Sequence, residues 1–70
     1  MTRSEITEAK LEKEGWTYDR TATSRGYKAA GSIDEMQSRG GYEYCRVYTS
    51  ECKGKDKYQL THIYKRQLAD

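Results

Sequence analysis

The chain has 70 residues, of which 34% are hydrophobic and 34% are charged, and its formal net charge is +2. This length allows one domain, residues 1–70, and its apolar runs are too short to span a membrane. The nearly balanced charge excludes a polybasic nucleic-acid-binding arm and an acidic DNA mimic. Large aliphatic side chains are few, so aromatic residues must help to fill the core.

Residues 4–14, SEITEAKLEKE, are typical of a helix. Thr2 or Ser4 can serve as its N-cap, and Thr2 with Glu5 has the spacing of a capping box. We expect its narrow apolar stripe to cover one face of a sheet, and that stripe consists of Ile6, Ala9 and Leu11.

The residues after this helix predict a turn into a first strand. Gly15 is placed to adopt the left-handed conformation that ends a helix, with Trp16 folding back on Leu11. Residues 16–23, WTYDRTAT, alternate in a way that favours a strand. One face of that strand would carry Trp16, Tyr18, Arg20 and Ala22. A short second strand is expected at residues 27–30.

The run SEITEAKLEKEGWTYDRT, residues 4–21, resembles the start of HicA-type toxins of bacterial toxin–antitoxin pairs. In that family a helix ending in Gly-Trp leads into the first strand of a double-stranded-RNA-binding fold. The resemblance covers about a quarter of the chain and implies the order helix, strand, strand. The family's catalytic histidine follows soon after a Gly-Ser step, whereas residues 23–26 here read TSRG. The resemblance therefore implies no ribonuclease activity, and we assign no family from it.

Residues 31–41, GSIDEMQSRGG, are expected to form a long loop that holds one or two helical turns. Ser32 and Glu35 again have capping-box spacing, and Ile33 and Met36 would then share one face. The two glycines at the end of the segment would stop the helical turns.

Residues 42–51 and 57–66 predict a long β-hairpin around the turn Lys53-Gly54-Lys55-Asp56. If Cys52 faces Asp56, one face of the hairpin carries Tyr42, Tyr44, Arg46, Tyr48, Tyr58, Leu60, His62 and Tyr64. The other face would carry Cys45, Val47, Thr49, Gln59, Thr61 and Ile63. A slip of one residue in the register would mix these two sets. The elements together predict an α+β fold, with an N-terminal helix packed on a three- or four-stranded antiparallel sheet that ends in this hairpin.

The chain contains seven tyrosines and no phenylalanine, and five of the tyrosines lie in residues 41–66. Two interpretations stay open, because a tyrosine ring can fill a core while its hydroxyl stays at the rim, or it can serve as a contact surface. If the tyrosine face is exposed, we expect the contact residues to be Tyr44, Arg46, Tyr48, Tyr64, Lys65 and Arg66.

The residues that carry chemistry do not form a recognisable catalytic or metal-binding set. His62 is the single histidine, and the spacing of Cys45, Cys52 and His62 matches no zinc site. We therefore expect no enzymatic activity, no metal and no cofactor. On one extended strand the two cysteine Cα atoms would lie about 23 Å apart, so we expect free thiols. Free thiols, with no apolar signal segment in MTRSEITEAK, predict a cytoplasmic location.

The size and polarity of the chain favour a non-enzymatic protein-binding protein. Such chains resemble the inhibitor or accessory proteins of phages and mobile elements, which act on a host protein or defence complex, anti-CRISPR proteins among them. The alternative is a single-stranded nucleic-acid or RNA-binding module that uses the Tyr/Arg-rich sheet face. The sequence leaves the oligomeric state open.

Overall fold

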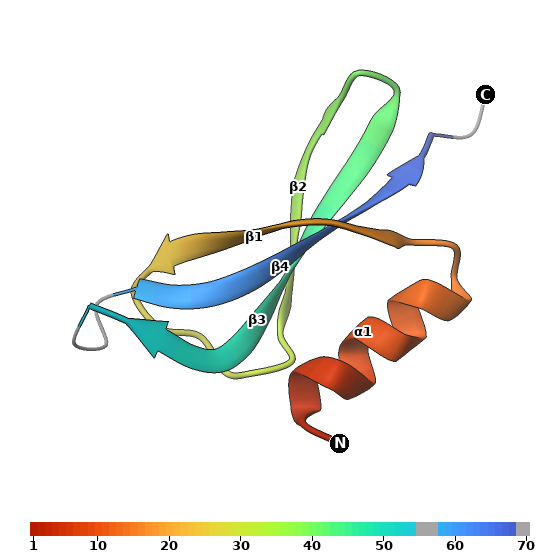
Figure 1. The fold of residues 1–70 in the computed structure, drawn as a ribbon. Coiled ribbons are helices and arrows are strands. Elements are labelled where there is room, and N and C mark those ends of the chain that lie inside the picture. The colour runs from red at the N-terminus through yellow and green to blue at the C-terminus, as the bar shows by residue number, and fades with distance from the viewer. Residues whose placement is uncertain (55–57, 69–70) are drawn as a thin grey trace.

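The computed structural model describes residues 1–54 and 58–68, and these residues form one helix and a four-stranded antiparallel sheet (Figure 1). The elements are α1 (Arg3–Lys13), β1 (Thr17–Arg25), β2 (Ile33–Arg39), β3 (Tyr42–Lys53) and β4 (Tyr58–Gln67). The strands lie in the order β1-β4-β3-β2, so β1 and β2 are the two edges of the sheet. The α+β fold and the hairpin strands expected from the sequence are confirmed.

Local hydrogen bonds set both ends of α1 where the sequence indicates. The Thr2 side chain accepts from the Glu5 N–H, and the Thr2 N–H donates to Glu5 Oε1 at 2.8 Å, which completes the capping box. Gly15 has a φ of 94°, and the Trp16 N–H donates to the Leu11 carbonyl at 3.0 Å. The expected capping box and the left-handed Gly15 are therefore confirmed, while the helix begins and ends one residue earlier than the expected range 4–14. Ile6, however, remains 45% exposed and does not join the core.

The segment of residues 31–41, which begins and ends with glycine, differs from the prediction. Its central residues form β2, which pairs with β3, and they do not form helical turns. Gly40 and Gly41 both have positive φ, 60° and 83°, and connect β2 to β3 as a two-residue hairpin turn. Residues 27–30, expected as a strand, belong instead to the connection between β1 and β2. Pairing with β3 supplies this segment with hydrogen bonds that one or two isolated helical turns could not match.

The register of the β3–β4 hairpin is shifted by one residue from the expected one. The observed pairs are Tyr44 with Lys65, Arg46 with Ile63, and Tyr48 with Thr61. A further irregularity lies between Tyr48 and Cys52, which pairs with Gln59. The expected turn and the expected pairing with Asp56 involve residues 55–57, which lie outside the described residues. As a result the β3 tyrosines and Tyr64 point to opposite faces of the sheet.

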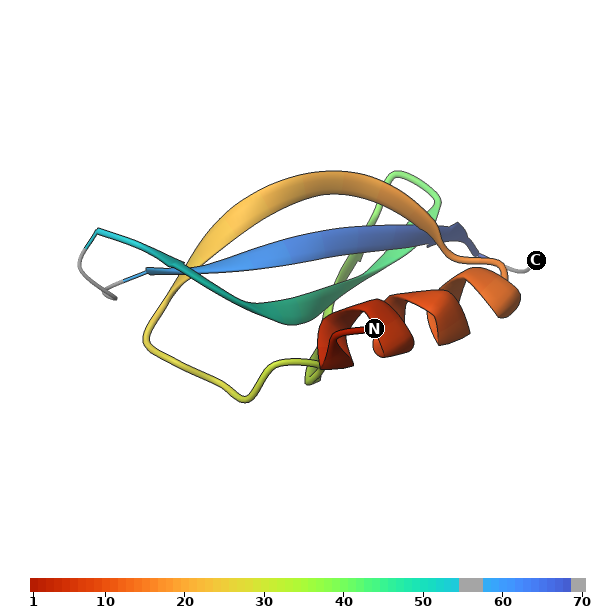
Figure 2. The same ribbon diagram turned by 60° about the horizontal axis from the view of Figure 1, so that its bottom comes forward.

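α1 packs against one face of the sheet, here called the helix face (Figure 2). The core on this face consists of Leu11, Cys45, Val47 and Tyr64, with Trp16 packed against them. The opposite face, here called the groove face, carries Tyr44, Arg46, Tyr48, Thr61, Ile63 and Lys65.

The connection between β1 and β2 covers one end of the groove face. The Lys28 N–H donates to Gln59 Oε1 at 2.8 Å, and Gln59 Nε2 donates to the carbonyls of Lys28 and Thr49, both at 2.7 Å. Gln59 is consequently only 1% exposed. Both polar atoms of the buried Gln59 amide therefore have hydrogen-bond partners, and these bonds hold the connection against the sheet. The connection does not cover the other end of the groove face.

Candidate functional site: a groove on the sheet

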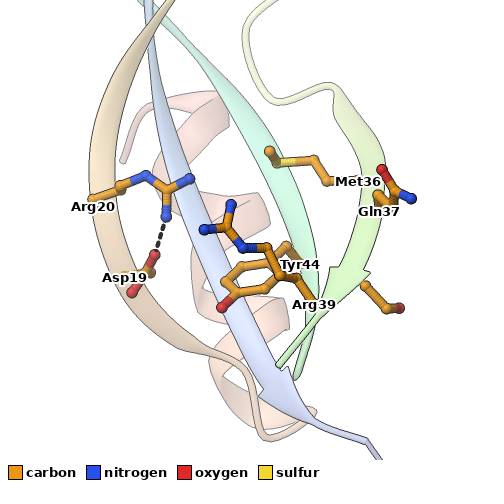
Figure 3. Close-up of a pocket in the computed structure, with 7 residues that line it drawn as sticks. Asp19, Arg20, Met36, Gln37, Arg39 and Tyr44 are labelled. Atoms are coloured by element: carbon orange, nitrogen blue, oxygen red, sulfur yellow. Dashed lines mark hydrogen bonds and ion pairs between the residues drawn. The ribbon is translucent and has the colours of Figure 1, made fainter. Parts of the chain in front are cut away.

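A groove of about 680 Å³ lies at the uncovered end of the groove face, near the Gly40-Gly41 turn (Figure 3). Its lining comes from β1, β2 and β3, and consists of Asp19, Arg20, Met36, Gln37, Ser38, Arg39 and Tyr44. β1 and β2 are the two edges of the sheet, so the sheet is curved enough for both edges to line the same groove. Figure 3 shows Arg20 and Asp19 on one side and Met36 and Gln37 on the other, with Arg39 and Tyr44 between them.

A β-bulge in β1 aims Arg20 into this groove. Tyr18 pairs with Tyr64, whereas Arg20 already pairs with Ile63, so Asp19 is an extra residue in the strand. The bulge reverses the alternation of side chains, and Tyr18 points to the helix face while Arg20 points to the groove face. The prediction that both side chains share one face is therefore wrong.

The groove end of the sheet carries a surplus of positive charge. The Asp19 carboxylate contacts both Arg20 and Lys65, with its Oδ1 3.5 Å from Lys65 Nζ. Arg39 and Arg46 have no carboxylate partner within salt-bridge distance in the described part of the chain. An incoming acidic group would therefore meet arginines that are free to bind it.

Arg46 lies in the middle of the groove face, where it pairs with Ile63 of β4 and Asp34 of β2. Its Nε atom is buried and has no hydrogen-bond partner within residues 1–54 and 58–68. Asp34 is already engaged, because it accepts from Lys28 Nζ at 2.6 Å and from the Tyr48 hydroxyl at 2.7 Å. The bonds from Lys28 and Tyr48 also hold the pKa of Asp34 below its ordinary value.

The six contact residues expected from the sequence divide between the two faces. Tyr44, Arg46 and Lys65 stay together on the groove face, and only Tyr44 lines the groove itself. Tyr48 shares their face but is 4% exposed, with its hydroxyl bound to Asp34.

Tyr64 and Arg66 lie on the helix face, so the expectation of one continuous patch is wrong for these two. Tyr64 is 4% exposed. The Arg66 guanidinium lies 4.5 Å from the centre of the Trp16 ring, and its Nε donates to Glu43 Oε2 at 3.0 Å. Both side chains hold parts of the protein together, although Arg66 remains 37% exposed.

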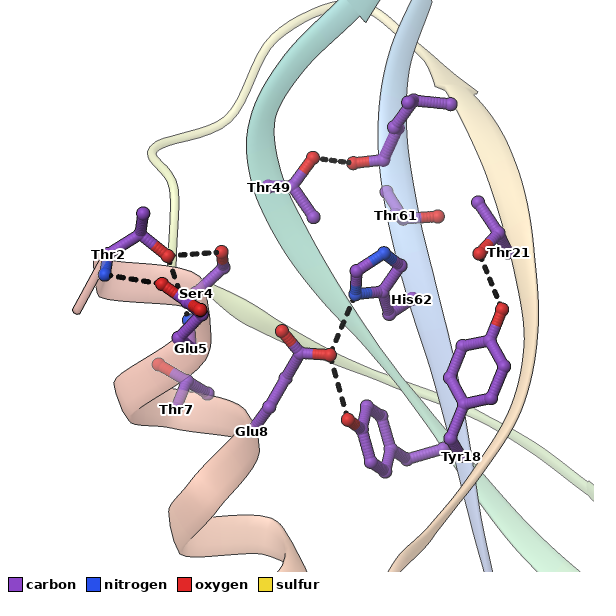
Figure 4. Close-up of polar contacts among 12 residues, drawn as sticks. Thr2, Ser4, Glu5, Thr7, Glu8, Tyr18, Thr21, Thr49, Thr61 and His62 are labelled. Atoms are coloured by element: carbon purple, nitrogen blue, oxygen red, sulfur yellow. Dashed lines mark hydrogen bonds and ion pairs between the residues drawn. The ribbon is translucent and has the colours of Figure 1, made fainter.

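The polar residues that join α1 to the sheet meet at Glu8 (Figure 4). Glu8 Oε1 accepts from the Tyr64 hydroxyl at 2.7 Å and lies 2.7 Å from His62 Nδ1. The Tyr18 ring packs edge-on against both partner rings, at 5.8 Å from His62 and 6.0 Å from Tyr64. Burial, and after it Glu8, raises the pKa of the Tyr64 hydroxyl. His62, whose side chain is 33% exposed, therefore helps to anchor the helix to β4.

The sequence analysis missed most of the residues that line the groove. Met36, Gln37, Ser38 and Arg39 belong to β2, and one signal for this strand was present in the sequence. A Gly-Gly pair between two extended runs is a strong indication of a two-residue hairpin turn. The bulge at Asp19 has no comparable signal, because nothing in WTYDRTAT marks the extra residue.

Comparisons with protein-family models, curated proteins and solved structures return no match. The helix-Gly-Trp-strand junction that resembles HicA-type toxins is present, with four strands after it in the described residues. Within those residues no group of three or more His, Cys, Asp or Glu side chains is placed to hold a metal ion. The described helix is also not long and apolar enough to cross a membrane.

Proposed function

We propose that this chain is a non-enzymatic binding protein whose groove contacts a partner protein. The observation that carries this proposal is the groove of about 680 Å³, which combines the Tyr44 ring, the Met36 side chain and the arginines Arg20 and Arg39. Aromatic residues, Met and Arg are the side chains most enriched at protein interfaces. Met is also flexible enough to adapt to a partner's surface.

The charge of the groove indicates the chemistry of the partner. Arg39, which lines the groove, lacks an ion pair in the described ranges, and Asp19 is already neutralised by Arg20 and Lys65. Arg46, which also lacks an ion pair, lies on the same face without lining the groove. A partner surface with exposed carboxylates would supply the missing acceptors and would be attracted over a distance. We therefore propose an acidic patch on a protein as the surface that the groove binds.

The proposed biological class is an inhibitor or accessory protein of phages or mobile elements that acts on a host protein or defence complex, such as an anti-CRISPR protein. What supports this class is the small, polar domain with an open groove, which suits a protein that acts by covering another protein's surface. The free thiols of Cys45 and Cys52 support a reducing compartment such as the cytoplasm.

A single-stranded nucleic acid is the second candidate ligand. Tyr44 and the arginines lie on one sheet face, where an aromatic ring can stack on a base and a guanidinium can bind phosphate. Two features of the same face disfavour it, namely the carboxylates of Asp19 and Asp34 and the low overall charge of +2. The protein partner is therefore the stronger proposal.

The two candidates are separated by capture from cell extract on immobilised wild-type protein, with and without nuclease. Tyr44→Ala removes the groove tyrosine, and Tyr27→Ala is the matched control because Tyr27 is 70% exposed and does not line the groove. We expect a nuclease-resistant protein that binds the wild type and the Tyr27 variant and is lost with Tyr44→Ala. Equal capture by all three proteins would contradict the role of the groove. Nuclease-sensitive capture whose affinity falls steeply with salt would favour nucleic acid.

A further inference from the structure

A second hollow, of about 370 Å³, lies on the helix face between the C-terminal part of α1 and the edge strand β2. Its lining includes the apolar side chains of Leu11, Trp16, Ile33 and Cys45, of which Leu11 and Cys45 are buried. Ile33 is 46% exposed even though it belongs to a sheet face that packs elsewhere against α1. The helix therefore leaves the β2 side of this face uncovered, and the Ile33 side chain remains open to a partner.

Arg66 shows which chemistry this cleft accommodates. Its guanidinium lies 4.5 Å from the centre of the Trp16 ring, its Nε donates to Glu43 Oε2 at 3.0 Å, and its Nη1 donates to the Glu14 carbonyl at 3.2 Å. The cleft thus already holds one cationic side chain through a carboxylate, a carbonyl and an aromatic face.

The cleft retains more negative charge than Arg66 neutralises. Its lining contains the carboxylates of Glu14, Glu35 and Glu43, three negative charges against the single positive charge of Arg66. Glu14 and Glu35 have no salt-bridge partner among residues 1–54 and 58–68. Glu14 is also the C-cap of α1, where the carbonyl end of the helix adds partial negative charge.

We propose that this cleft is a second docking site, one that binds a basic side chain flanked by apolar residues on a partner protein. The aliphatic stem of a partner's Arg or Lys would cover Ile33, and its charged head would reach Glu14 and Glu35. A small inorganic cation would leave the apolar lining unused, and a phosphate backbone would be repelled by the carboxylates. Met36, Ser38 and Tyr44 line both hollows. The carboxylates of the cleft nevertheless lie on the opposite face from Arg20 and Arg39, so the site goes beyond the proposed function of the groove.

The test uses a short peptide as the probe and the ¹⁵N-labelled full chain as the receptor. The blocked peptide acetyl-Val-Arg-Leu-amide is titrated while the amide spectrum and the Trp16 indole N–H are followed. We expect saturable shifts at Trp16, Ile33 and Glu35, with a dissociation constant on the order of 1 mM, as befits so small a ligand. The matched peptide acetyl-Val-Gln-Leu-amide has a similar length without the charge, and it should bind about tenfold more weakly.

Variants assign the binding to the carboxylates. Glu14→Gln and Glu35→Gln should each weaken binding about threefold, and the double variant about tenfold. Glu51→Gln is the control, because Glu51 is an exposed carboxylate on β3 that does not line the cleft, and it should leave the affinity unchanged. The proposal is overturned if the Arg and Gln peptides bind alike, if the double variant keeps the wild-type affinity, or if the shifts map to Arg20 and Arg39 instead.

Discussion

At the scale of single residues, the tyrosines explain how a chain without phenylalanine builds a core. The rings of Tyr48 and Tyr64 are both 4% exposed, and each hydroxyl donates to a carboxylate, Asp34 or Glu8, at 2.7 Å. A phenylalanine at either position would bury the same ring and leave that carboxylate with one bond fewer. Tyrosine thus fills space and fixes a neighbouring element with the same side chain.

Gly15 provides a first test at this scale. Its φ of 94° lies in the left-handed region, where a side chain is strained whatever the space around it. We expect Gly15→Val to lower the free energy of unfolding by more than about 1 kcal/mol, measured by chemical denaturation. Gly15→Asn is the matched variant, because Asn tolerates this conformation, and it should cost clearly less. A midpoint for Gly15→Val equal to that of the wild type would show that the helix end is not fixed by this residue.

The two thiols are expected to differ in reactivity. Cys45 is 3% exposed and burial raises its pKa to about 11, whereas Cys52 is half-buried. A thiol reagent at pH 8 should therefore modify Cys52 in the folded protein and reach Cys45 only after denaturation. Two thiols that react equally fast in the native protein would contradict the placement of Cys45 in the core.

The raised pKa of Cys45 also predicts a loss of stability at alkaline pH. The unfolded thiol ionises above its ordinary pKa of 9.0 and the folded thiol only near about 11. The unfolded state therefore binds fewer protons in this window, and the free energy of unfolding should fall as the pH rises from 9 to 11. Cys45→Ala should make the decline shallower in denaturation curves recorded at each pH. An equally steep decline in the variant would assign the effect to other groups, the Tyr64 hydroxyl first among them.

At the scale of elements, the docking of α1 depends on polar contacts as much as on apolar burial. Leu11 is the one large aliphatic side chain that the described helix buries, at 6% exposure, while Ile6 stays in solvent. Glu8 compensates by contacting His62 and Tyr64 on β4. A helix held in this way should be sensitive to the loss of a single carboxylate.

A double-mutant cycle measures that contact. Glu8→Ala and Tyr64→Phe together remove the two partners of one hydrogen bond, and we expect a coupling energy of about 1–2 kcal/mol from unfolding curves. The control cycle pairs Glu8→Ala with Tyr48→Phe, since the Tyr48 hydroxyl binds Asp34 on the other face. That cycle should give no coupling. Equal coupling in both cycles would mean that the variants act through a general loosening of the fold.

At the scale of the whole molecule, the two faces of the sheet carry hollows whose charged side chains differ in sign. The groove face presents Arg20, Arg39 and Arg46, and the cleft on the helix face presents Glu14 and Glu35. Surfaces of opposite sign on one small domain allow two partners, or two parts of one partner, to be distinguished by charge. The face on which a tyrosine lies also determines which of the two proposed binding sites its substitution can test.

Stability measurements should separate the tyrosines by burial rather than by face. Tyr48→Ala and Tyr64→Ala each remove a buried ring, which costs about 3–5 kcal/mol, as much as the entire stability expected of so small a core. We expect circular dichroism to show both variants largely unfolded at room temperature. Tyr44 is only half-buried, so Tyr44→Ala should keep a cooperative thermal transition. Loss of that transition in Tyr44→Ala would place this tyrosine in the core rather than at the groove.

The sequence by itself determined the features that depend on near neighbours. The capping box of Thr2 and the left-handed Gly15 fix the ends of α1 through bonds between residues a few positions apart. The β-branched and aromatic residues of the hairpin strands determined β3 and β4, and the wide spacing of the cysteines predicted free thiols. Of the groove, the sequence identified Tyr44 and the basic character of its surroundings.

Only the tertiary structure decided which side chains share a face. The bulge at Asp19, the shifted register that pairs Tyr44 with Lys65, and the pairing of β2 with β3 each depend on strands that are distant along the chain. Side chains alternate every residue along a strand, so one extra residue moves every later side chain to the other face. The energy difference between such registers is a sum over contacts across the whole sheet. No local pattern in the chain contains that sum, and for this reason Tyr64 and Arg66 lie beneath the helix and Arg20 lies in the groove.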